Sequence, residues 1–93
     1  VYDRIFTERA GRDEGNQFDL GGSDEDGKEA TLPQILNPAK YAPELASGEY
    51  LKNANAIMKQ LLAPEVNVGV AHAIYKPAGV GAATPWHQDE AYW

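Results

Sequence analysis

The sequence predicts a small α+β domain, and three patterns of apolar residues support this fold class. Apolar residues recur at helical spacing between residues 49 and 62, and two short stretches, 17–20 and 31–36, alternate between apolar and polar side chains. A third stretch, 66–76, is rich in valine and long enough for a strand. Because 93 residues suffice for one domain at most and the first is not Met, we expect residues 1–93 to be one partial domain of a longer protein.

The first part of the chain is predicted to contribute the end of a helix and two strands. Gly11 is suited to end the helix, although a frayed terminus is an alternative. The strands 17–20 and 31–36 are joined by the polar loop 21–28. Pro33 cannot donate to a strand ladder, so the second strand is expected at a sheet edge. Four apolar residues at helical spacing predict the helix: Val1, Tyr2, Ile5 and Phe6.

Residues 49–62 are predicted to form the main helix, after a short helix that opens at Pro43. Ser47 is suited to cap the start of the main helix, and Pro64 to end it. We expect the apolar stripe to face the core, because its residue types do not suggest a cofactor site. The stripe consists of Tyr50, Leu51, Ala54, Ile57, Met58, Leu61 and Leu62.

Residues 66–76 are predicted to form a core strand. Its two faces are mostly apolar or small, so we expect burial on both sides. By the period of two, His72 shares a face with Val70 and Ile74. A glycine-rich connection then leads to residues 85–93, which are expected to form the last strand.

Composition narrows the possible function classes. The net charge is −6 and the eight Lys and Arg residues are scattered, which disfavours a nucleic-acid partner. The apolar runs are too short for a membrane span, and no signal-peptide pattern is present. With no Cys, the chain suits a reducing compartment, and we expect a cytoplasmic protein.

Residues 85–93 carry the chemistry that distinguishes the chain. On a strand, residues i and i+2 point to the same face, so His87 and Asp89 should project together. An imidazole and a carboxylate placed in this way are two-thirds of the facial triad that holds non-haem Fe(II). The ordinary alternative is a surface histidine hydrogen-bonded to a neighbouring carboxylate. The aromatic neighbours Trp86, Tyr92 and Trp93 favour the metal site, because they would restrict water around it.

The run Trp86-His87-Gln88-Asp89-Glu90-Ala91-Tyr92-Trp93 resembles the iron-binding segment of the phytanoyl-CoA dioxygenase family, whose members are Fe(II)- and 2-oxoglutarate-dependent oxygenases. Three upstream segments, 34–38, 61–66 and 75–79, match in the expected order. The resemblance covers roughly residues 17–93. It implies an incomplete double-stranded β-helix (jelly roll) with supporting helices at its N-terminal side.

The resemblance also implies a set of site residues. His87 and Asp89 match the first two iron ligands, and Asp89 indicates oxygenation rather than halogenation. Trp93 matches an aromatic position of the cosubstrate and substrate pocket, and Gln88 and Tyr92 belong to the same motif. His72 is either a pocket residue or, as we favour, a core histidine. The implied reactants are 2-oxoglutarate, O₂ and a small-molecule substrate that is hydroxylated.

In this family the third ligand, a histidine, and the arginine that binds 2-oxoglutarate lie further along the chain. The remainder of the oxygenase domain would therefore be needed to complete the site, and residues 1–93 alone are expected to be inactive. Two alternatives stay open. One is a non-catalytic jelly-roll binding module that retains a remnant of the metal motif. The other is a jelly-roll metalloprotein in which His87 and Asp89 hold Zn or Mn.

Overall fold

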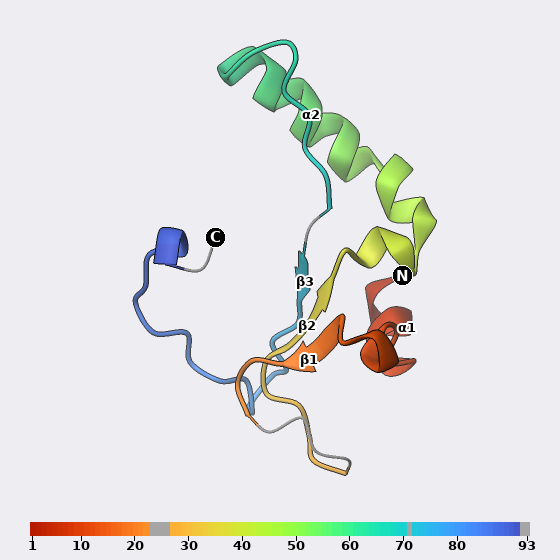
Figure 1. Cartoon of the computed structure of the whole chain (residues 1–93), viewed down its shortest axis with the longest axis vertical. Helices are drawn as coiled ribbons and strands as arrows, with labels where there is room; N and C mark the ends of the chain where they lie inside the picture. Colours follow the sequence, from red (N-terminus) through yellow and green to blue (C-terminus); the bar gives the residue numbers. More distant parts are fainter. Residues whose placement is uncertain (23–26, 71, 92–93) are drawn as a thin grey trace.

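The computed structural model describes residues 1–22, 27–70 and 72–91 of the chain (Figure 1). These residues form a small α+β structure, which confirms the predicted class. The two helices are α1 (Tyr2–Thr7) and α2 (Glu49–Leu61), and the strands are β1 (Gln17–Asp19), β2 (Pro33–Leu36) and β3 (His72–Ile74). Four short 3-10 helices complete the described elements: η1 (Arg12–Glu14), η2 (Pro38–Lys40), η3 (Pro43–Ser47) and η4 (Asp89–Ala91).

The strands form one open antiparallel sheet in the order β1-β2-β3. Gln17 lies opposite Ile35 in the first pair, and Leu36 lies opposite His72 in the second. The prediction that Pro33 marks an edge strand is wrong, because β2 is the central strand. Pro33 is tolerated because it is the first residue of β2. At this end of the ladder to β3 the backbone of Pro33 contributes its carbonyl, so the missing amide costs no hydrogen bond there. That carbonyl accepts a hydrogen bond of 2.9 Å from the Tyr75 amide.

A small core holds α1 against the sheet. Ile5 of α1, Ile35 of β2 and Ala42 are completely buried, and Phe6 and Leu45 pack against them. Figure 1 shows α1 beside β1, with the start of the chain close to the segment that carries η2 and η3. Because β1 and β3 both pair with β2, burial of Ile35 fixes the whole sheet relative to α1.

The turn after α1 differs from the expectation for Gly11. The helix is closed by Arg9, whose φ is 53°, and the Ala10 amide donates to the Ile5 carbonyl at 2.9 Å. Gly11, with a φ of 80°, instead begins η1. A side chain at Gly11 would collide with the ring of Tyr41, so this position needs glycine for space as well as for its backbone conformation.

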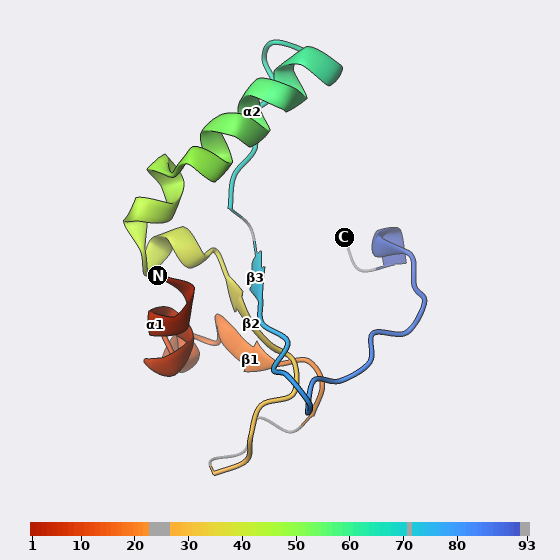
Figure 2. The same ribbon diagram turned by 180° about the vertical axis from the view of Figure 1, so that it is seen from behind.

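The helix α2 covers Glu49–Leu61 and begins after Gly48 rather than after a Ser47 cap. Apart from Leu51, its apolar stripe is not buried within the described residues, which contradicts the expectation that the stripe faces the core. Leu51 is buried, whereas Tyr50, Ile57, Leu61 and Leu62 are exposed. Figures 1 and 2 show the reason, since α2 follows η3 and extends away from the sheet.

The predicted strand 66–76 is reduced to His72–Ile74. Upstream of it, both backbone groups of Val68 bond to the side chain of Asn55 on α2, with the Val68 amide at 2.7 Å and its carbonyl at 3.1 Å. The chain is therefore held by the helix here rather than by a neighbouring strand. Expected burial on both faces is also wrong, because Ile74 is 57% exposed.

The loop between β1 and β2 is closed by one carboxylate. Asp19 accepts hydrogen bonds from the amides of Gly21 (3.0 Å), Thr31 (2.9 Å) and Leu32 (2.7 Å). Desolvation, the largest single effect, raises the pKa of Asp19, but these hydrogen bonds together hold that pKa below its usual value of 3.8. A depressed carboxylate pKa adds stability that is fully present above the usual value and is lost as pH falls through the folded-state pKa.

The first prediction concerns the core. Replacing Ile35 with Ala should lower the free energy of unfolding by about 2–4 kcal/mol. The Ile35 side chain is fully buried, and its removal leaves a cavity that the neighbouring side chains fill only in part. Urea denaturation followed by circular dichroism measures this change. The control is Ile57→Ala on the exposed stripe of α2, expected to cost under about 0.5 kcal/mol. Equal losses in both variants would contradict the assignment of the core.

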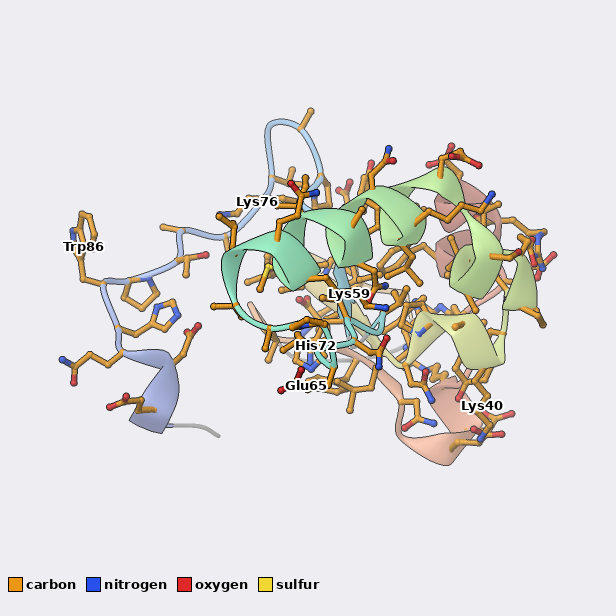
Figure 3. The ribbon with its side chains drawn as sticks, turned by 90° about the horizontal axis from the view of Figure 1, so that it is seen from above. Lys40, Lys59, Glu65, His72, Lys76 and Trp86 are labelled. Atoms are coloured by element: carbon orange, nitrogen blue, oxygen red, sulfur yellow. The ribbon has the colours of Figure 1, made fainter. Side chains whose placement is uncertain are left out.

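The second prediction concerns Asp19. The variant Asp19→Asn should have a lower midpoint of thermal unfolding than the wild type at about pH 7. The difference should shrink as pH falls through the folded-state pKa of Asp19, which lies below the usual value of 3.8, because the wild-type carboxylate then also becomes protonated. The control is Glu65→Gln, an exposed carboxylate after α2 (Figure 3), which should leave the midpoint unchanged at both pH values. A pH-independent effect of Asp19→Asn would argue against the charged hydrogen bonds.

Candidate metal centre

The segment that carries His87 and Asp89 extends away from the sheet. Figures 1 and 2 show residues 77–88 as an open stretch that leaves the end of the sheet and leads to η4. It is tied to the body near its start, where the Ala82 amide donates to the Thr31 carbonyl at 3.0 Å. Lys76 also donates to the Thr84 hydroxyl at 3.3 Å.

The predicted strand 85–93 is not present in the described part of this segment. Residues 81–88 form neither a helix nor a strand, and the chain then enters η4, which starts at Asp89. Thr84, Pro85, Trp86 and His87 line a shallow hollow on the segment. The tight turn at Asp89, and not a strand pleat, therefore sets the direction of the two candidate ligands.

His87 and Asp89 nevertheless face each other, as their spacing suggested. His87 Nε2 lies 3.1 Å from Asp89 Oδ1. The other ring nitrogen, Nδ1, lies 2.9 Å from the carbonyl oxygen of Pro85. The His87 side chain is 40% exposed and that of Asp89 is 78% exposed, so the pair is open to solvent.

The contact with Pro85 decides which ring nitrogen faces the carboxylate. A carbonyl oxygen is only an acceptor, so Nδ1 must carry a proton and donate it to Pro85. In the neutral ring, Nε2 then presents a lone pair to a carboxylate oxygen that is also an acceptor. Two acceptors at this distance require a cation between them, which can be a proton or a metal ion.

The electrostatics agree with this geometry. The pKa of His87 is raised above its usual value, first by the hydrogen bond to the Pro85 carbonyl and also by the charge and hydrogen bond of Asp89, while desolvation lowers it. Without a metal, the proton on Nε2 is therefore held more tightly than on a free histidine. The Pro85 carbonyl could not be singled out from the sequence, since a backbone group leaves no residue-type signal.

The remaining predicted site residues are not gathered around the pair within the described chain. Gln88 is exposed and Trp86 is fully exposed, pointing away from the body of the protein in Figure 3. His72 lies in β3, half-buried, and Figure 3 shows it in the body, apart from Trp86. The predicted pocket residues Tyr92 and Trp93 lie outside the described residues.

Residues 1–22, 27–70 and 72–91 contain no group of three or more His, Cys, Asp or Glu side chains able to hold a metal ion. His87 and Asp89 thus form a two-ligand site at most in this part of the chain. Among the same residues, none of the helices has the length and apolar character needed to cross a membrane.

Comparison with known proteins gave no match to a protein-family model, to a curated protein or to a solved structure. The resemblance to the phytanoyl-CoA dioxygenase family therefore depends on the sequence motifs alone. The closeness of His87 and Asp89 is a separate structural observation.

The third prediction separates a site role from a structural role. His87→Ala and Asp89→Ala should leave the circular dichroism spectrum and the midpoint of thermal unfolding unchanged, because both side chains are exposed and neither belongs to the core. The comparison variant is Ala42→Asp, which places a charge in the core and should unfold the protein. A clear loss of structure in either exposed variant would assign these residues to folding instead.

Proposed function

We propose that this chain is part of an Fe(II)- and 2-oxoglutarate-dependent oxygenase that hydroxylates a small organic molecule. In this proposal the three-stranded sheet belongs to a double-stranded β-helix that other segments complete. His87 and Asp89 are two of the iron ligands, and a histidine from another segment is the third. The observation that carries the proposal is the orientation of the His87 ring by Pro85.

This orientation is the one that a metal-binding histidine requires. Metal-ligating histidines donate the other ring N–H to a carbonyl or carboxylate, which fixes the tautomer and aims the free lone pair at the ion. In His87 the donated proton is on Nδ1, so Nε2 is the ligating atom. Asp89 Oδ1 supplies a second hard donor, as non-haem Fe(II) prefers.

The separation of the two donor atoms also fits one ion. Two ligands bound at about 2.1 Å and at about a right angle lie about 3.0 Å apart. The observed distance between Nε2 and Oδ1 is 3.1 Å. This distance suits two ligands of one ion as well as it suits a hydrogen bond.

When bound, the iron with 2-oxoglutarate and O₂ supplies the oxidising power for hydroxylation. The task of this chain is to hold the ion with a neutral imidazole and one carboxylate and to leave the other positions open. Gln88, Tyr92, Trp93 and His72 stay the proposed pocket residues. The arginine that binds 2-oxoglutarate is expected on a later segment.

The exposure of the pair favours a second candidate. A histidine and a carboxylate that are 40% and 78% exposed could equally be an ordinary surface ion pair on a non-catalytic binding module that retains a remnant of the motif. A related site that holds Zn or Mn is the third possibility, since both ions accept the same donors.

The fourth prediction tests the proposed activity in the full-length protein. With Fe(II), 2-oxoglutarate and O₂ it should form succinate, and His87→Ala or Asp89→Ala should reduce that rate at least about 100-fold. The matched control is Asp3→Ala on the exposed face of α1, which should keep most of the rate.

Metal analysis of the same anaerobically prepared protein distinguishes the candidates. Bound Fe(II) with succinate formation supports the oxygenase. Stoichiometric Zn or Mn without succinate formation supports the other metalloprotein, and the absence of both metal and turnover supports the binding module. Either of the last two results would overturn the proposal.

A further inference from the structure

A small closed loop, residues 76–84, connects the sheet to the segment that carries the candidate metal pair. The Gly81 amide donates to the Pro77 carbonyl at 3.0 Å and forms a turn inside the loop. Lys76 Nζ donates to the Thr84 hydroxyl at 3.3 Å and closes the loop between residues that are 8 positions apart. Two hydrogen bonds therefore shape a loop that is mostly exposed to solvent.

The stem of the Lys76 side chain occupies the space beside Gly81. A Cβ at Gly81 would lie 2.6 Å from Lys76 Cγ and 2.9 Å from the Pro77 carbonyl oxygen, which is closer than such atoms approach. Glycine therefore leaves the room in which the stem lies across the turn, and the ammonium group reaches Thr84 from there. Packing as well as hydrogen bonding thus determines the position of Lys76.

The loop is also attached to the body of the protein through Ala82. The Ala82 amide donates to the Thr31 carbonyl at 3.0 Å. A Cβ at Gly21 would lie 2.7 Å from Ala82 Cβ, so Ala82 packs directly on the backbone of the loop between β1 and β2. Asp19 closes that loop by accepting hydrogen bonds from the amides of Gly21 and Thr31. The connecting loop therefore starts from a fixed place on the fold.

A stiff connection links Thr84 to the candidate ligands. Pro85 has a fixed φ and restricts the backbone of the preceding Thr84 to extended conformations. Few torsions therefore stay free between the Thr84 hydroxyl and the Pro85 carbonyl, which accepts a hydrogen bond from His87 Nδ1 at 2.9 Å. The other ring nitrogen of His87 faces Asp89. A continuous series of contacts thus runs from Lys76, just after β3, to the candidate metal pair.

We propose that Lys76 is a positioning residue for the candidate metal pair. Its side chain closes the loop on Thr84 and so sets the place of the Pro85 carbonyl, which orients the His87 ring. This inference rests on the proposed function, because the purpose of the position is metal binding. Its structural part is measurable without a metal. One exposed hydrogen bond contributes modestly, so the expected effect on metal affinity is several-fold rather than complete loss.

The test removes one partner of the bond at a time with little change of shape. Lys76→Met removes the ammonium group and keeps an apolar stem, and Thr84→Val removes the hydroxyl. In the metal-free, full-length protein each variant should increase the picosecond-to-nanosecond motion of the amides of residues 86–88. Order parameters from ¹⁵N NMR relaxation measure this motion, and those of β1 and β2 should stay unchanged.

Metal affinity measures the consequence for the site. Anaerobic titration of the full-length protein with Fe(II) should show about fivefold weaker binding for Lys76→Met and for Thr84→Val. The double variant should lose no more affinity than either single variant, because both changes remove the same interaction. Lys76→Arg keeps a charged donor at this position and should restore most of the affinity and of the order.

The charge control is Lys59→Met, which removes one exposed positive charge from α2 and should leave both measurements unchanged (Figure 3). If the wild type binds no Fe(II), the proposed oxygenase function fails, and the order parameters alone decide whether Lys76 positions the segment. If it does bind, unchanged order or unchanged affinity in Lys76→Met would overturn the proposal, as would additive losses in the double variant. A lower midpoint of thermal unfolding in Lys76→Met would assign Lys76 to folding and overturn it as well.

Discussion

Burial of Ile35 is the interaction on which the rest of this structure depends. Ile35 sits in the central strand, and it meets Ile5 of α1 and Ala42 of the segment between η2 and η3 in one small core. The other two strands depend on this residue, because β1 and β3 each pair with β2 in the described sheet. A core of this size cannot hold long segments by packing, so polar contacts hold them instead. Asp19 closes the loop between β1 and β2, and Asn55 holds the chain that returns from α2.

The sequence predicts the elements whose pattern is local. The main helix was expected at 49–62 and is found at Glu49–Leu61, because a 3.6-residue period over thirteen residues has one structural solution. The antiparallel pair of β1 and β2 follows in the same way from alternation on both sides of a polar loop. The prediction that β2 lies at the edge of the sheet was wrong, because the effect of a proline depends on which neighbouring strand its missing amide would face.

The two strands that were predicted wrongly share one physical cause. Residues 66–76 and 85–93 have strand-like patterns, but a strand exists only where a partner supplies hydrogen bonds. Val68 finds its partner in the side chain of Asn55, and the backbone before Asp89 turns into η4. The closeness of His87 and Asp89 was still predicted, because a spacing of two residues brings side chains together in more than one backbone conformation. The orientation of His87 by Pro85 could not be anticipated, since a carbonyl group belongs to every residue.

The contact between Asn55 and Val68 has a consequence for how the sheet is assembled. Leu36 and His72 must meet across a long intervening segment before β3 can join β2. The helix α2 and the Asn55 side chain turn that segment back on itself through contacts that are close in sequence. When the segment between β2 and β3 is already folded back, fewer residues remain as a flexible loop between the two strands. The chain then loses less conformational entropy when β3 pairs with β2. The contact between Asn55 and Val68 therefore lowers the entropic cost of joining β3 to β2.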